Sequence, residues 1–200
     1  MKNFMAIAKW TLHHTWVICV GYLVSMIVLL LIHGAFGFSM NDDGTYLSNA
    51  LMHIGSGAIL GMGTGLLQKE LLKKYFHVPF FWVFSLVIGF VFAELVAGFV
   101  LWKLEIYRGL IDLFNTDHHL PEASIFALAG LISGILQYRF LKPCGKGRFY
   151  WIIASTLGWG LLILSTFLGL YGFILGALLY GVITGFVLFN IPGLKNQINT

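Results

Sequence analysis

Two stretches of equal length carry the strongest signals for the fold: GMGTGLLQKELLKKYFHVPFFW at residues 61–82 and GLISGILQYRFLKPCGKGRFYW at residues 130–151. Each begins with an apolar segment that has two glycines four residues apart. Each then continues through a glutamine and a basic turn to a tryptophan. Small residues four apart let helix backbones approach closely in lipid. The stretches therefore predict membrane helices that pack through glycine and are joined by basic turns.

The composition of the whole chain favours a membrane protein. Hydrophobic residues make up 58% of the 200 residues, charged residues make up only 10%, and the mean hydropathy is +0.87. A soluble domain carries about 25% charged residues. So few charges leave more apolar surface than a water-soluble protein of this length can cover. The composition therefore excludes a soluble globular domain and favours the lipid bilayer as the solvent.

Six apolar segments are long enough to span a membrane. A hydrocarbon core about 30 Å thick needs roughly 20 residues of helix. The segments are 16–33, 46–68, 80–102, 121–141, 149–168 and 171–189. We therefore predict an all-α polytopic membrane helical bundle of six transmembrane helices, which forms a single transmembrane domain over residues 1–200.

The basic residues predict the orientation of these helices, because Lys and Arg collect in cytoplasmic loops. With the N-terminus inside, only Lys103 and Arg108 lie on the outer side. The other basic residues are all cytoplasmic: Lys2, Lys9, Lys69, Lys73, Lys74, Arg139, Lys142, Lys146, Arg148 and Lys195. We expect both termini in the cytoplasm and the protein in a bacterial plasma (inner) membrane. The net charge of +4 and the pI near 9.1 reflect these loops and not a nucleic-acid partner.

The two quoted stretches are 69 residues apart, and a partial third copy keeps the glycine spacing in the last span. We therefore predict three helical hairpins related by a pseudo-threefold axis, with repeat units at about 16–68, 80–141 and 149–189. We expect the glycine-bearing spans two, four and six at the centre, and the tryptophans at the inner membrane interface. The predicted helix-packing glycines are Gly57, Gly61, Gly65, Gly130, Gly134, Gly181 and Gly185.

The Gly-x3-Gly-x2-Gln pattern and the tryptophan-headed segments resemble small, uncharacterised bacterial multi-spanning membrane proteins. The resemblance extends from Gly61 to Gly185 and implies no activity. Duplicated helices also occur in transporters, but those usually have longer repeats and broken helices, and no span here contains an internal proline.

Ionisable residues inside the predicted spans mark a candidate site near the outer face. Glu94 lies in the third span and His53 at a similar depth in the second. A charge there is unfavourable by several kcal/mol unless it is paired, hydrated or protonated. Glu122 occupies the position equivalent to His53 at the 69-residue offset. The residues expected to face one outer cavity are His33, His53, Glu94, Asp117, His118, His119 and Glu122.

Two interpretations of this cluster stay open. His53, Glu94, His118, His119 and Glu122 are of the types that bind zinc or manganese or relay protons. Alternatively, Glu94 is a neutral or hydrogen-bonded carboxyl that ties two helices together, and Glu122 stabilises the positive end of its own helix. No HExxH or comparable motif is present. The sequence therefore assigns no cofactor, and a divalent metal at these candidates is the one alternative.

Gln68 and Gln137 repeat near the inner face. We expect them to hydrogen-bond between helices or to line an inner vestibule. The sequence contains no Gly-x-Ser-x-Gly elbow, phosphate-binding loop, haem-attachment cysteine pair or dinucleotide fingerprint. It therefore names no catalytic and no cofactor-binding residue.

Three classes of function fit these features. The first is an accessory or structural membrane component without catalytic activity, whose partners are the bilayer and another membrane protein or a second copy of the chain. The second is a small transporter or channel-like protein that binds a cation or proton at His53, Glu94 and Glu122. The third is a membrane-embedded metal-dependent enzyme. The first class needs the fewest assumptions, so we expect a non-catalytic protein.

Overall fold

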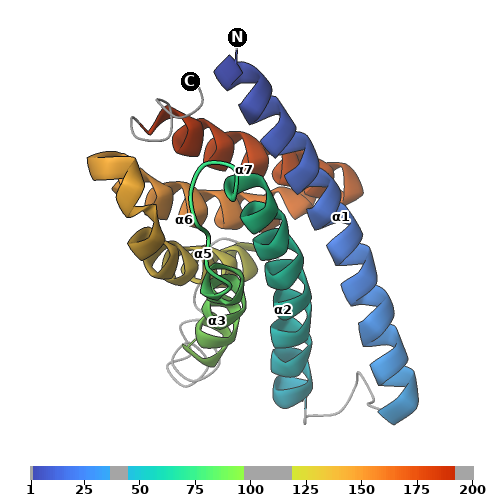
Figure 1. The fold of residues 1–200 in the computed structure, drawn as a ribbon. Coiled ribbons are helices and arrows are strands. Elements are labelled where there is room, and N and C mark those ends of the chain that lie inside the picture. Colours follow the sequence, from blue (N-terminus) through green and yellow to red (C-terminus); the bar gives the residue numbers. More distant parts are fainter. Residues whose placement is uncertain (1, 37–44, 97–118, 192–200) are drawn as a thin grey trace.

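The computed structural model describes residues 2–36, 45–96 and 119–191, and these ranges contain helices and turns but no strand. The all-helical prediction is therefore confirmed for them. The α-helices, labelled in Figure 1, are α1 (Lys2–Phe36), α2 (Thr45–Leu72), α3 (Phe81–Val96), α5 (His119–Tyr138), α6 (Phe149–Leu164) and α7 (Gly169–Asn190). The described ranges also contain two 3-10 helices: η2 (Arg139–Arg148) follows α5, and η3 (Ser165–Leu168) follows α6.

The α-helices of the described chain close into a ring. α1 packs on α2, α2 on α3, α3 on α5, α5 on α6, α6 on α7, and α7 again on α1. Figure 1 shows α6 and α7 running across the view while α1 and α2 run from top to bottom. The helices therefore cross one another at an inclination, as helices that pack through small residues commonly do.

Glycines set the closest approach within this ring. A Cβ atom on Gly65 of α2 would lie 2.9 Å from the Cα of Val83 on α3, and one on Gly134 of α5 would lie 3.1 Å from the Cα of Ile152 on α6. The second contact is the first one displaced by 69 residues on both helices. Gly181 brings α7 equally close to α1. In the order of the ring, the glycine-bearing helices α2, α5 and α7 alternate with the tryptophan-bearing helices α1, α3 and α6. α2, α5 and α7 correspond to the predicted spans two, four and six. Their backbones therefore do not pack together as the predicted central trio.

The buried apolar side chains form two clusters. One cluster joins the starts of α1, α3 and α6 to the ends of α2 and α7 and to η2, which follows α5, and it contains Trp10, Trp82 and Trp151. We call this region the tryptophan end. The other cluster contains Phe90 and Tyr180 and draws residues from all the α-helices of the described chain. One end of every α-helix in the described chain therefore meets at the tryptophan end.

Two helical stretches of the described chain are long and apolar enough to cross a membrane, Asn3–Val28 and Phe149–Asn190. The second stretch contains both α6 and α7, and the chain changes direction between them at Gly169, whose φ of 66° suits glycine. Phe81–Ala93 and Glu122–Tyr138 are shorter apolar helices. Among the described residues, length and apolarity therefore identify fewer spans than the six predicted.

The first helix differs most from its prediction. α1 begins at Lys2, well before the expected start of the first span at residue 16. No glycine or proline interrupts the chain between these positions. The added turns place Trp10 and His14 in the interior, where both side chains are fully buried.

Candidate functional site

A group of hydrogen-bonded polar side chains lies buried at the tryptophan end. Trp82 Nε1 donates a hydrogen bond of 2.9 Å to Gln68 Oε1, and Trp151 Nε1 donates one of 2.9 Å to Gln137 Oε1. In both pairs the tryptophan follows its glutamine by 14 residues, and all four side chains are fully buried. An equivalent tryptophan–glutamine hydrogen bond therefore closes each of the two basic turns.

These two pairs are bonded to each other and to α7. Gln68 Nε2 donates to the hydroxyl of Tyr180 over 3.1 Å. Gln137 Nε2 donates to Gln68 Oε1 over 3.4 Å and to the backbone carbonyl of Trp82 over 3.3 Å. We call Gln68, Trp82, Gln137, Trp151 and Tyr180 the tryptophan–glutamine network. It links five helices, and its hydrogen bonds offset the desolvation of two buried amides.

The first helix reaches the same region through a third tryptophan. Trp10 Nε1 donates to Thr184 Oγ1 over 3.0 Å, and Thr184 Oγ1 donates to the carbonyl of Tyr180 over 2.7 Å. The ring of Trp151 lies 6.4 Å from that of Trp10 and 5.8 Å from that of Trp82. Three indoles from three helices therefore meet at the tryptophan end, and aromatic pairs at these distances are favourable.

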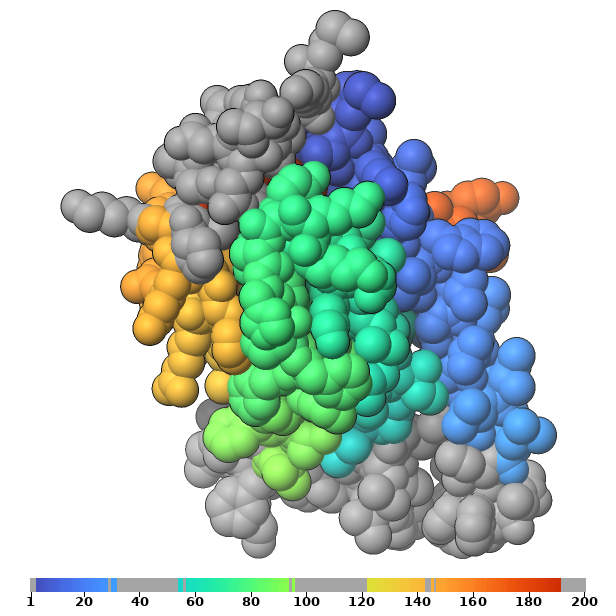
Figure 2. All heavy atoms as spheres, in the orientation of Figure 1, coloured from blue at the N-terminus to red at the C-terminus, as the bar shows by residue number. Residues whose placement is uncertain are grey.

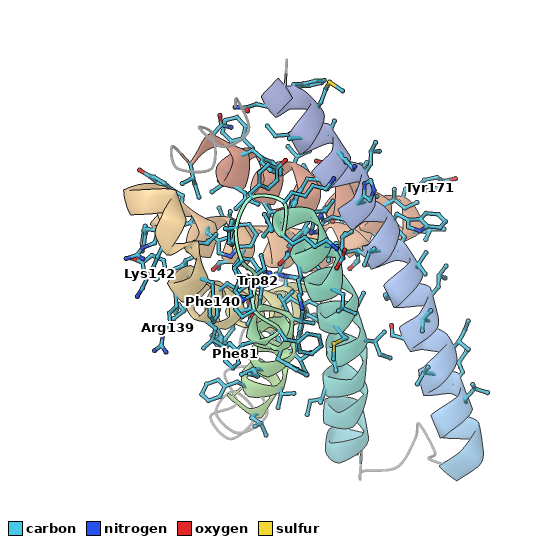
Figure 3. The ribbon with its side chains drawn as sticks, viewed as in Figure 1. Phe81, Trp82, Arg139, Phe140, Lys142 and Tyr171 are labelled. Atoms are coloured by element: carbon cyan, nitrogen blue, oxygen red, sulfur yellow. The ribbon has the colours of Figure 1, made fainter. Side chains whose placement is uncertain are left out.

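The expectation that the tryptophans anchor the protein at the membrane interface is wrong for Trp82 and Trp151. Both side chains are fully buried inside the ring. Figure 3 shows Trp82 in the interior, while Arg139 and Lys142 project away from the helices. The reason is that each indole N–H has a glutamine partner within the protein. The sequence signal that points to this pairing is the 14-residue separation, which recurs in both stretches.

Other buried polar atoms in the described chain have no hydrogen-bond partner, among them His14 Nε2 and Thr64 Oγ1. His14 Nδ1 donates to the carbonyl of Trp10 over 2.8 Å, so the ring nitrogen Nε2 is left as an acceptor. The His14 ring lies 5.7 Å from the ring of Tyr180. The interior therefore retains some unused hydrogen-bonding capacity beside the tryptophan–glutamine network.

The predicted outer cluster falls mostly outside the described side chains. His53 is on α2, Glu94 is on α3 and His119 begins α5, but their side chains and the whole of His118 lie outside what the structure describes. Glu122 is half-buried in the first turn of α5. No group of three His, Cys, Asp or Glu residues that could hold a metal ion occurs among the described residues. Metal binding and proton relay at these residues therefore stay predictions.

Comparison of the chain with protein-family models, with curated proteins and with solved structures finds no match. The chemistry of the described site is that of helix association: the indole and amide groups of the tryptophan–glutamine network bond to one another across helices. These groups supply hydrogen bonds between helices.

Proposed function

We propose that the chain is a multi-pass integral membrane protein of a bacterial plasma membrane. It has six spans in three related helical hairpins, with both termini in the cytoplasm. It acts as an accessory or structural component without catalytic activity.

The observation that carries the membrane location is that the described helices bury polar side chains and expose large apolar ones. Gln68, Gln137 and Ser133 are fully buried, whereas large apolar side chains are exposed. Figure 2 shows a face on which α1, α2 and α3 lie side by side. Seven of the exposed apolar residues of α1 recur at helical spacing and form what we call the α1 stripe: Met5, Leu12, Trp16, Val20, Leu23, Ile27 and Leu30. An exposed apolar surface of this length suits lipid and not water.

Two contacts support the orientation and the repeat. Near the start of α1, the ring of Trp10 lies 5.7 Å from that of Phe189 near the end of α7. The helix ends assigned to the cytoplasm by their basic residues thus lie together. The close contact of Gly65 with Val83 recurs at the 69-residue offset on α5 and α6, which supports related hairpins.

The tryptophan–glutamine network supports the accessory role. A transporter with alternating access must move one group of helices against another. Here hydrogen bonds between buried side chains tie α2 to α7 and α5, and separating them would leave buried polar groups without partners. An interior whose helices are joined by buried hydrogen bonds suits a component that keeps one conformation in the bilayer. Such a component presents its apolar faces to lipid or to another membrane protein.

Thermal unfolding of the detergent-purified protein tests the accessory role against ligand binding. Wild type and Glu94→Gln are compared with and without Zn²⁺ or Mn²⁺ and across pH. We expect no ligand-dependent change in the midpoint, and a variant at least as stable as wild type, because Glu94 then only packs between helices. A stabilisation by metal or by pH that disappears in Glu94→Gln would contradict the accessory role.

That contrary result would favour the second candidate, a small transporter or channel-like protein that binds a cation or proton. One observation speaks for it: His14 Nε2 and Thr64 Oγ1 are buried polar atoms without a partner in the described chain. Groups of this kind inside a membrane protein commonly line ion or proton paths.

A further inference from the structure

A pocket opens at the tryptophan end, where α1, the turn after α2 and the end of α7 come together. Its lining includes Lys9, Trp10, Lys74, Tyr75 and Phe189. We call it the lysine pocket. Its lining shares no residue with the tryptophan–glutamine network or with the predicted outer cluster, so neither feature accounts for it.

The two lysines bring uncompensated charge to this pocket. Lys9 and Lys74 are both exposed and have no acidic partner among the described residues. The neighbouring Lys73 differs, because its ammonium group pairs with Glu70. Two lysines from separate elements therefore line one pocket, and their positive charge suits a ligand group with negative charge.

The remaining walls of the lysine pocket are largely apolar. The ring of Phe189 lies 5.7 Å from that of Trp10 and 6.0 Å from that of Tyr75. Lys9 also falls within the α1 stripe, at the helical spacing of its apolar members. Its ammonium group thus lies beside a long exposed apolar surface, where a lysine stem packs and its charge reaches the interface. The ligand chemistry that fits is an anion joined to a large apolar body.

We propose that the lysine pocket binds the phosphate of an anionic phospholipid, with the acyl chains of the lipid along the α1 stripe. This proposal rests on the membrane location proposed above. The phosphate lies between Lys9 and Lys74 and compensates their charge. The acyl chains cover apolar surface that a water-soluble phosphate ester would leave exposed. Basic residues at a membrane surface attract anionic lipids in this way.

Titration of the detergent-solubilised protein with phosphatidylglycerol or phosphatidylcholine, followed by native mass spectrometry, tests the proposal. The test variant is Lys9→Gln/Lys74→Gln. The matched control is Lys73→Gln/Lys142→Gln, which loses the same charge outside the pocket (Figure 3 shows Lys142 projecting away from the helices). We expect the test variant to bind phosphatidylglycerol about 25-fold more weakly, since each lysine contributes a factor of about five. The control keeps wild-type affinity, and phosphatidylcholine binds all three proteins weakly.

Three results would overturn the proposal. The first is equal binding of the two lipids by wild type, and the second is equal weakening in both double variants. The third is displacement of the lipid by glycerol 3-phosphate at matching concentration, which would assign the pocket to a soluble phosphate ester. Fractionation of the cells that produce the protein distinguishes a failure of the lysine pocket from a failure of the proposed membrane location. A membrane-bound protein without lipid preference refutes the lysine pocket alone, whereas wild type in the soluble fraction refutes the membrane location itself.

Discussion

Replacement of Gly130 by alanine is expected to lower the stability of the protein by about 2 kcal/mol or more, because it forces α5 and α6 apart. A Cβ atom at this position would lie 2.5 Å from the carbonyl oxygen of Ser155 and 3.1 Å from the Cα of Thr156. Both are backbone atoms of α6, so no side-chain rotation relieves the contact. In a chain of this length the midpoint of thermal unfolding in detergent should fall by about 4–8 °C.

Gly63→Ala is the matched control for this substitution. Gly63 also lies in a helix that carries close-packed glycines, but a Cβ there would meet only the Cγ1 of Val17, at 3.4 Å. Alanine favours a helix over glycine by about 1 kcal/mol, so the control should unfold at the wild-type midpoint or above it. Equal midpoints for Gly130→Ala and Gly63→Ala would show that α5 and α6 do not make backbone contact.

Gln68→Leu should be the most damaging single change in the tryptophan–glutamine network, at about 2–4 kcal/mol. The Gln68 side chain accepts buried hydrogen bonds from Trp82 and Gln137. It also donates a buried hydrogen bond to Tyr180. Leucine is of similar size but leaves three buried polar groups without this partner, and each such loss is unfavourable by about 1 kcal/mol. Denaturant or thermal unfolding in detergent measures the effect.

A double-mutant cycle with Trp82→Phe separates the hydrogen bond from packing. Phenylalanine removes the indole N–H that Gln68 accepts. We expect the double variant to be less destabilised than the sum of the single variants by about 1 kcal/mol, since the second change removes a bond that is already broken. Effects that add within about 0.3 kcal/mol would mean that the two side chains do not interact.

The all-helical fold of the described residues could be predicted from apolar composition and spacing, because so few charges predict a lipid environment, in which helices satisfy the backbone. The glycine spacing also indicated close helix contacts. It did not indicate which helices meet, since a glycine face fits any apolar neighbour. The structure brings Gly65 to Val83 of the following helix, and a ring results where a central trio was expected.

The tryptophan–glutamine network was only partly accessible from the sequence. Gln68 and Gln137 stood out as repeated polar residues near the inner face, but tryptophan at the head of a membrane helix is as typical of an interfacial anchor as of a buried donor. The role of the third tryptophan, Trp10, was harder to predict from the sequence. Trp10 lies before the predicted first span, and its acceptor is Thr184, one turn away from Leu188, which replaces the glutamine in the third copy.

Cysteine labelling of intact spheroplasts tests the membrane arrangement most directly. Single cysteines are introduced by Asp42→Cys or Lys142→Cys in a chain whose native cysteines are replaced by Cys19→Ser and Cys144→Ser. A membrane-impermeant maleimide should label residue 42 in intact spheroplasts and residue 142 only after the membrane is opened, because the first lies in a predicted outer loop and the second in a cytoplasmic one. Labelling of both positions before the membrane is opened would contradict a multi-pass protein with this orientation.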